Sequence, residues 1–224
     1  MILVGRAGSG KDTVAELLCD NLPRYAFADA LKETIHVIQE QGVNAGMEYL
    51  SSLSGHSVEE LNGILPVVQT IEKTVLDGKQ RGHLQSLGNG LRALFQDFWI
   101  IVLRNRLIED NPKGYIVTDC RFENELKMLQ ELDVGEPWYR KSVFISANKR
   151  ERIKRMKQRD GSCDTSKLND VSETSVDSLK SMCDYTINNS KDLTHLKTLV
   201  DNINRDIQME KQEYGQGITH DCNN

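Results

Sequence analysis

Short runs of hydrophobic residues alternate along the chain with longer segments in which hydrophobic residues recur every three to four positions. A short apolar run bounded by glycine, proline or acidic residues predicts a buried strand, whereas the longer spacing predicts an amphipathic helix. Strands that alternate with helices favour a parallel sheet with crossover helices. The sequence therefore predicts an α/β fold with a five-stranded parallel sheet, its strands near residues 1–4, 24–28, 115–118, 142–145 and 185–187.

The segments between these strands carry the helical patterns. Asp29 is suited to cap a helix that starts at this residue. Residues 41–80 contain helical pieces and no strand-like alternation, so we expect a mostly helical insertion that can move as a flap. An apolar periodicity of 3.6 residues over 81–110 predicts one long helix. Further helices are expected at residues 123–132 and 193–207, with a frayed polar tail after residue 210.

The first twenty residues combine a strand, a glycine-rich turn and a helix. The apolar run 1–4 leads into Gly-Arg-Ala-Gly-Ser-Gly-Lys-Asp-Thr at residues 5–13, and an amphipathic run follows. Glycines let backbone N–H groups curl around a phosphate, and the helix N-terminus adds partial positive charge. Lys11 can then reach the β- and γ-phosphates of a nucleotide. This context favours a phosphate-binding loop of nucleoside-triphosphate enzymes over a chance glycine-rich turn.

One position of this loop is unusual. The residue after the lysine of such a loop is ordinarily Ser or Thr, whose hydroxyl ligates Mg²⁺. Here it is Asp12, and Thr13 follows. The magnesium ligand is therefore Thr13, Asp12 through a water molecule, or neither.

Composition narrows the classes of function. The 224 residues suffice for one α/β domain with a small insertion, and no apolar run approaches the roughly 20 residues of a membrane span. The first strand begins at Met1, so no signal peptide is expected. A net charge of −5 argues against a general nucleic-acid binder. The five cysteines show no zinc or disulfide pattern and indicate free thiols in a reducing cytoplasm: Cys19, Cys120, Cys163, Cys183 and Cys222.

Polar residues share one face of the helix expected at 81–110. Arg81, Gln85, Gly88 and Arg92 fall within a narrow sector at 100° per residue. Gly88 and Gly90 each cost about 1 kcal/mol in a helix, which indicates a break or the close approach of a bulky group. Two arginines beside an amide suit a phosphate and the edge of a base. The alternative is a solvated polar face.

Asp119 follows the buried strand at 115–118. Ligands of open α/β sheets bind outside the carboxyl ends of the strands, so this carboxylate is placed to hold Mg²⁺ through water or to orient a substrate. It is equally suited to cap a helix or to pair with Arg121.

A basic run extends from Lys149 to Arg159. Arg152, Arg155 and Arg159 share one helix face at spacings of three and four. A solvated helix or a nucleic-acid patch is one interpretation. Beside a phosphate-binding loop, arginines of a mobile lid can instead stabilise the charge on a phosphoryl group during transfer.

With these motifs in place, the chain resembles the bacteriophage-type deoxynucleoside monophosphate kinases of the nucleoside monophosphate kinase superfamily. The likeness covers most of the chain in the right order, through residues 5–13, 27–32, 81–88, 97–99, 118–125, 152–160, 172–173 and 184–189. It implies a five-stranded parallel sheet and Mg²⁺-dependent transfer of the γ-phosphoryl group of ATP to a deoxynucleoside monophosphate. It also implies a core at 1–40, 81–148 and 176–210, a helical monophosphate-binding insertion at 41–80, a lid at 149–175 and a polar tail at 211–224.

The resemblance assigns roles by matching position. The residues implied to bind ATP are Gly8, Ser9, Gly10, Lys11, Asp12, Thr13, Arg152 and Asn188. Those implied to bind the monophosphate are Asp29, Lys32, Arg81, Gln85, Arg92, Arg121 and Asn124. The implied catalytic groups are Lys11, Arg155, Arg159 and Asp119, with Thr13 and Asp119 toward Mg²⁺. Asn189-Ser190-Lys191 departs from the glycine-bearing turn usual after the last strand.

Rival functions stay open. Dephospho-coenzyme A kinase shares the loop, basic run and terminal Ile-Asn turn, and phosphomevalonate kinase shares Gly-Lys-Asp-Thr. A regulatory protein that binds nucleotides without transfer would need no lid arginines. A nucleic-acid module at 149–159 is the least favoured alternative. Nucleotides are the expected partners, with no nucleic acid and no membrane, in the cytoplasm. The sequence leaves open the accepted bases and whether the chain forms a homodimer.

Overall fold

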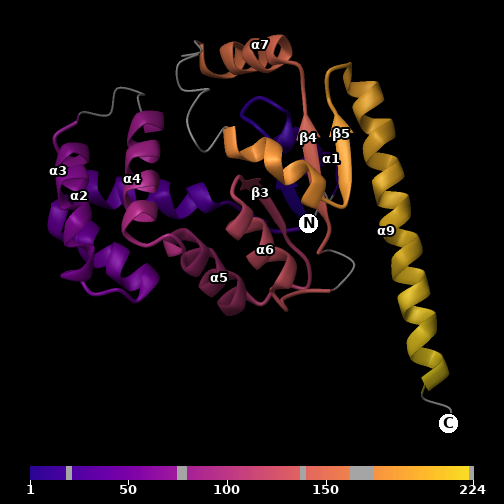
Figure 1. Cartoon of the computed structure of the whole chain (residues 1–224), viewed down its shortest axis with the longest axis horizontal. Helices are drawn as coiled ribbons and strands as arrows, with labels where there is room; N and C mark the ends of the chain where they lie inside the picture. The colour runs from indigo at the N-terminus through magenta and orange to yellow at the C-terminus, as the bar shows by residue number, and fades with distance from the viewer. Residues whose placement is uncertain (19–21, 75–79, 137–139, 162–173, 222–224) are drawn as a thin grey trace. The chain divides into compact units, whose positions relative to one another are not determined.

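The computed structural model describes residues 1–18, 22–74, 80–136, 140–161 and 174–221 (Figure 1). The chain divides into two compact units. Unit 1 comprises Met1–Tyr25 and Asn111–Asn224, and unit 2 comprises Ala26–Asp110. The functional assignments of residues 41–80 as an insertion and 149–175 as a lid stay predictions.

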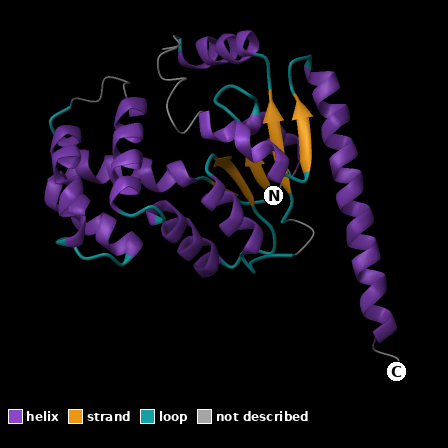
Figure 2. Ribbon diagram, viewed as in Figure 1, coloured by secondary structure: helices purple, strands orange, loops and turns teal. Residues whose placement is uncertain are grey.

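Unit 1 contains a parallel sheet, as the alternation of strands and helices predicts. Among the described residues, five strands pair in the order β2-β3-β1-β4-β5, all parallel (Figure 2). Their bounds are β1 Ile2–Val4, β2 Arg24–Tyr25, β3 Ile116–Cys120, β4 Ser142–Ser146 and β5 Tyr185–Asn188. The central strand β1 sets Ile2 opposite Val117 of β3 on one side and Ser142 of β4 on the other. The predicted α/β fold with a five-stranded parallel sheet is therefore confirmed.

Helices cover this sheet. Their bounds are α1 Lys11–Leu18, α6 Glu123–Glu131, α7 Lys149–Asp160, the 3-10 helix η4 Ser175–Met182 and α9 Leu193–Asp221. Apolar residues of α1 and α9 pack with the strands in one core that includes Leu3, Val14, Ile145, Ile187 and Val200. Burying each such side chain contributes about 1.5–3 kcal/mol.

The closing helix is longer than the sequence pattern predicts. Helix α9 continues to Asp221, so the predicted helix end at residue 207 is wrong. The Glu210 carboxylate pairs with the Lys141 Nζ at 2.9 Å, which ties the helix to the start of β4. The residues beyond this ion pair include several good helix formers and no proline, so the backbone hydrogen bonds can continue.

Unit 2 is helical in its described part. It contains α2 Phe27–Ser54, the 3-10 helix η1 Glu60–Ile64, α3 Leu65–Glu72, α4 Gln80–Leu94 and α5 Phe98–Asp110. Helix α2 begins at Phe27, with Ala26 as its N-cap, so the prediction of Asp29 as the cap is wrong. Asp29 lies instead in the first turn, where an acidic side chain interacts favourably with the helix dipole.

The helix predicted at 81–110 is two helices, α4 and α5. The chain leaves the first after Leu94, and the Asp97 carbonyl accepts the Ile101 N–H at 2.9 Å to start the second. Aromatic packing explains the break, because the Phe95 ring stacks on His56 with centroids 4.0 Å apart. The indole Nε1 of Trp99 donates to the Gly88 carbonyl oxygen at 3.2 Å. These contacts favour a corner over one straight helix.

No helix in the described part of the chain is both long and apolar enough to span a bilayer. Two of the predicted free thiols lie in the described residues, the buried Cys120 and the half-buried Cys183. Burial raises the pKa of both thiols, that of Cys183 to about 11, so they stay protonated near neutral pH. The other three cysteines lie outside the described residues.

Candidate functional site

The glycine-rich loop joins the central strand β1 to helix α1. Gly8 and Gly10 have φ values of 74° and 94°, a region that favours glycine. The Ser9 N–H donates to the Arg6 carbonyl at 3.1 Å, and the Val14 N–H donates to the Gly10 carbonyl at 3.0 Å as the helix begins. The loop therefore stands at the carboxyl edge of the sheet, where ligands of open α/β folds bind.

The side chain of Lys11 lies within this loop. Only 8% of the residue is exposed, and its Nζ donates to the carbonyl oxygens of Gly5 at 2.6 Å and Arg6 at 3.2 Å. Asp12 is exposed and Thr13 is half-buried on the first turn of α1. A buried ammonium group beside a helix N-terminus provides a concentrated positive potential, which suits a bound phosphate.

The arginines of α7 contact the loop from outside. Arg152 is 7% exposed, and its Nε donates to the Ala7 carbonyl at 2.9 Å. Arg155 donates through NH1 to the Ser9 carbonyl at 3.3 Å. Arg159, one turn later, is exposed. The first two arginines thus hold backbone oxygens of the loop, and a role for Arg155 and Arg159 as clamps on a transferred phosphoryl group stays a prediction.

Asn189 is a site residue that the sequence reasoning missed. It is 5% exposed, and its Nδ2 donates to the Ser9 carbonyl at 2.9 Å. Asn188, which the resemblance implies to bind ATP, is exposed, and its Oδ1 accepts a hydrogen bond from Ser190 at 2.6 Å. A signal was present in the sequence. Asn189 lies two residues after the buried Ile187, so it points to the same side of the strand.

The end of β3 carries a second set of expected site residues. Asp119 is half-buried and lies inside β3, and the N-cap of α6 is Phe122, so Asp119 does not cap this helix. Glu125, 2% exposed, accepts the backbone N–H groups of Arg121 at 2.8 Å and Phe122 at 3.1 Å. The Asn124 Oδ1 accepts the Glu125 N–H at 3.1 Å. The buried Glu125 carboxylate therefore holds the backbone of Arg121 and Phe122, which leads into α6.

A bidentate ion pair joins the loop to η4. The Arg6 Nε donates to the Asp177 Oδ1 at 2.9 Å, and its NH2 pairs with Oδ2. The Ser175 hydroxyl, at the start of the same 3-10 helix, donates to the Arg121 carbonyl at 3.0 Å. These contacts bring the segment that follows residues 162–173 to the glycine-rich loop and to the end of β3. The middle of the predicted lid, residues 162–173, lies outside the described residues.

Unit 2 carries the other residues expected to bind a monophosphate. Gln85 and Arg92 are half-buried on α4, and the Arg92 NH1 donates to the Gly88 carbonyl at 3.4 Å. The side chain of Arg81 lies outside what the structure describes. Helix α4 is continuous, and a Cβ on Gly90 would lie 2.4 Å from the Ile64 Cδ1. Close approach, rather than a break, therefore explains the glycine at position 90.

The remaining two expected residues of unit 2 pair with each other. The Lys32 Nζ lies 3.2 Å from the Asp29 Oδ1 on the first turns of α2, and the lysine side chain is exposed. An ion pair three residues apart on a helix contributes about 0.2–0.5 kcal/mol and leaves both groups accessible to water.

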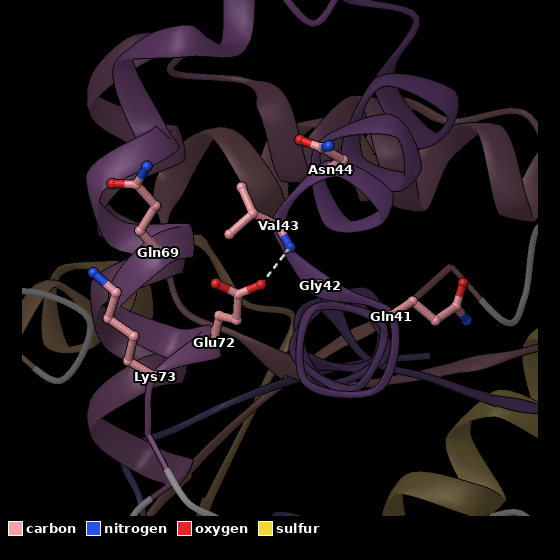
Figure 3. Close-up of a pocket in the computed structure, with 7 residues that line it drawn as sticks. All are labelled: Gln41, Gly42, Val43, Asn44, Gln69, Glu72 and Lys73. Atoms are coloured by element: carbon pink, nitrogen blue, oxygen red, sulfur yellow. Dashed lines mark hydrogen bonds between the residues drawn. The ribbon is translucent and has the colours of Figure 1, made fainter.

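Unit 2 also contains a pocket that none of the expected residues lines (Figure 3). Its volume is about 490 Å³, and it lies where α2 bends at Gly42, whose φ is 89°. The Glu72 carboxylate of α3 accepts the Val43 N–H at 3.1 Å and so satisfies a donor that the bend releases. Gln41, Asn44, Gln69 and Lys73 complete the polar lining.

Magnesium binding by the chain stays a prediction. Among the residues that the structure describes, no cluster of three or more His, Cys, Asp or Glu side chains is suited to hold a metal ion. Mg²⁺ commonly takes only one or two protein ligands, with water and substrate phosphates completing its shell. The half-buried Thr13 hydroxyl and Asp119 carboxylate are oxygen donors of this kind in unit 1.

Comparison with known proteins gives one similar relative of stated activity. No family model matches the chain. The chain is similar to the deoxynucleoside-5'-monophosphate kinase of Escherichia phage T5, with 27% identity over 180 residues. The match covers 58% of this chain and 70% of the phage protein.

Proposed function

We propose that the chain is a kinase that transfers the γ-phosphoryl group of ATP to a deoxynucleoside 5′-monophosphate, for the synthesis of DNA precursors. The observation that carries the proposal is the glycine-rich loop at the carboxyl edge of a parallel sheet, with the buried ammonium group of Lys11 inside it. The similarity to the phage T5 enzyme supports the kinase class and suggests the acceptor.

In this proposal the loop binds the donor nucleotide. The N–H groups of Gly8, Ser9 and Gly10 would surround the ATP phosphates, and the Lys11 Nζ would exchange its backbone carbonyl partners for phosphate oxygens. Thr13 and Asp119 would hold Mg²⁺, directly or through water, and the bound ion would neutralise charge on the phosphates.

The chemical step needs no protein nucleophile. An oxygen of the acceptor monophosphate forms a bond to the γ-phosphorus of ATP while the bond from that phosphorus to the β,γ-bridging oxygen breaks, which releases ADP and a deoxynucleoside diphosphate. Lys11, Arg155 and Arg159 would stabilise the charge on the transferred group. Closure of the segment at 149–175 would exclude water and limit hydrolysis of ATP.

The acceptor would use the arginines and the amide of α4 together with other polar residues. Arg92 and Arg81 suit a phosphate, because a guanidinium group donates two parallel hydrogen bonds. Gln85 offers one donor and one acceptor to the edge of a base. The resemblance also implies roles in binding the monophosphate for Asp29 and Lys32 of unit 2 and for Arg121 and Asn124 of unit 1.

The direct test is ADP formation from ATP and Mg²⁺ with a panel of acceptors. The panel contains dAMP, dGMP, dCMP, dTMP, their ribose counterparts and dephospho-coenzyme A. Turnover with one or more deoxynucleotides is the expected result and gives the base selectivity. Turnover with dephospho-coenzyme A alone, or ATP binding without any turnover, would overturn the proposal in favour of the rival kinase or of a regulatory nucleotide-binding protein.

A single substitution tests the loop within this assay. Lys11→Ala should lower kcat/KM for ATP by about 10²–10³-fold, because it removes a preorganised positive charge from the transferred group. Lys197→Ala is the matched control, since Lys197 is exposed on α9. Equal activity of the two folded variants would contradict the assignment of Lys11.

A further inference from the structure

Three consecutive carbonyl groups of the loop accept hydrogen bonds from side chains outside it. The Ala7 carbonyl bonds to an arginine of α7 at 2.9 Å, and the Gly8 carbonyl bonds to the next arginine of this helix at 3.5 Å. The Ser9 carbonyl accepts from the same arginine at 3.3 Å and from the Asn189 Nδ2 at 2.9 Å. All three oxygens are thus turned toward α7 and the end of β5.

The direction of these carbonyls fixes the direction of the following N–H groups. The chain has no cis peptide bond in its described part, and in a planar trans peptide the C=O and N–H point in opposite directions. The Gly10 N–H therefore points away from Asn189. Gly10 has no Cβ to restrict its own backbone, so its peptide depends on an external partner to keep this orientation.

Asn189 is itself held firmly. Its N–H donates to the Ser146 carbonyl at 2.8 Å, which extends the β4–β5 pairing by one residue. Its carbonyl accepts from the Arg155 NH2 at 2.9 Å. The side-chain amide also fills the space beside Gly10, since a Cβ there would lie 2.3 Å from the Asn189 Nδ2. A side chain this constrained can orient a flexible peptide.

We infer that Asn189 is a positioning residue of the phosphate-binding loop. Its amide holds the Ser9 carbonyl so that the Gly10 N–H faces the phosphates of the donor nucleotide. The inference deepens the proposed function and rests on it, because it requires that the loop binds a nucleotide. It requires no contact between Asn189 and the nucleotide.

The test is the affinity of the full chain for ADP in the presence of Mg²⁺, measured by calorimetry on two variants. Asn189→Ala removes the amide, and Asn189→Asp keeps the size but replaces the donor with a carboxylate oxygen. Both should weaken ADP binding by about 2- to 13-fold, the effect of losing one of the two side-chain hydrogen bonds that hold the Ser9 carbonyl. Asn202→Ala and Asn202→Asp, at an exposed position of α9, are the controls and should bind as wild type does.

A spectroscopic measurement separates positioning from a loss of structure. In wild type the ¹⁵N–¹H resonance of Gly10 should move downfield when Mg²⁺-ADP binds, because its N–H gains a phosphate acceptor. In both folded Asn189 variants this shift should shrink, while the resonances of β4 amides stay in place. A full Gly10 shift in a folded variant, or ADP affinity within twofold of wild type, would overturn the inference.

The outcomes of these experiments distinguish a failure of this inference from a failure of the proposed kinase function on which it rests. If wild type binds no nucleotide, the proposed function fails and the inference fails with it. If wild type binds ADP and transfers phosphate while the folded variants bind equally well, only the inference fails. If neither variant folds, a measurement on the wild-type protein tests the inference instead. The Asn189 side-chain amide resonances must then shift on ADP binding while those of Asn202 do not, and no shift would overturn the inference.

Discussion

Alanine at Gly10 tests how tightly the loop is packed against the end of β5. The glycine has a φ of 94°, and the new Cβ would lie 2.3 Å from the Asn189 Nδ2. No real contact is this short, so the amide of Asn189 would have to move. Its hydrogen bond to the Ser9 carbonyl, 2.9 Å long, would then be lost.

The size of the effect follows from two separate terms. An L-residue with positive φ costs about 1–2 kcal/mol relative to glycine. The Ser9 carbonyl loses its bond to the Asn189 amide and keeps its bond to Arg155, which costs about 0.5–1.5 kcal/mol. Gly10→Ala should therefore lower the free energy of unfolding of unit 1 by about 1.5–3.5 kcal/mol. Gly161→Ala is the matched control, because Gly161 has a φ of 73° and open space around its Cβ position, so only the first term applies.

Hydrogen–deuterium exchange of β4 peptides at increasing urea concentration measures the unfolding of unit 1 independently of unit 2. The two glycine variants should differ by about 0.5–1.5 kcal/mol, which is the contribution of the Asn189 hydrogen bond. Adding Asn189→Ala to Gly10→Ala should cost little more, because that bond is already lost in the single variant. A difference below about 0.5 kcal/mol between the two glycine variants, or strict additivity in the double variant, would refute the reasoning.

Two further predictions concern unit 2. Gly90→Ala should destabilise this unit by about 1–3 kcal/mol in urea unfolding, because the new Cβ would lie 2.4 Å from the Ile64 Cδ1. Adding Ile64→Val, which deletes that Cδ1 atom, should restore most of the lost stability. A gain in stability from Gly90→Ala alone would contradict this prediction. Burial and the hydrogen bond to Glu33 raise the pKa of Tyr49 to about 12. The contribution of this raised pKa to the free energy of unfolding is fully present below pH 10 and is lost as the pH rises through 12. The difference between the alkaline absorbance titrations of wild type and Tyr49→Phe should show one phenol with a midpoint near 12, and a midpoint near 10 would count against this assignment.

The sequence alone predicted the elements whose signals are local. The loop at residues 5–13 needs only a strand before it and a helix after it, and both are contiguous in the chain. The strands β3 and β4 each contain a short apolar run between turns, so their parallel arrangement followed from the alternation with helices. A contiguous pattern suffices here because strand, turn and helix are each specified by neighbouring residues.

Helix ends were less well predicted, because distant residues decide them. The corner between α4 and α5 depends on stacking of Phe95 against His56, which is 39 positions earlier in the chain, as the two residue numbers show. The length of α9 is supported by an ion pair between Glu210 and Lys141. Neither contact leaves a periodic signal in the sequence around the helix end.

The sequence by itself determined the parallel sheet, the position of the glycine-rich loop between β1 and α1, and the basic helix α7. Only the tertiary structure decided that Arg152 and Asn189 hold the carbonyls of that loop and that Arg6 pairs with Asp177. These partners are more than 140 residues apart, and each is brought to the loop by the order of the strands in the sheet. A local pattern can specify a helix or a turn, but long-range pairing of strands places side chains from distant segments against one another, so the chemistry between such segments emerges only in the folded chain.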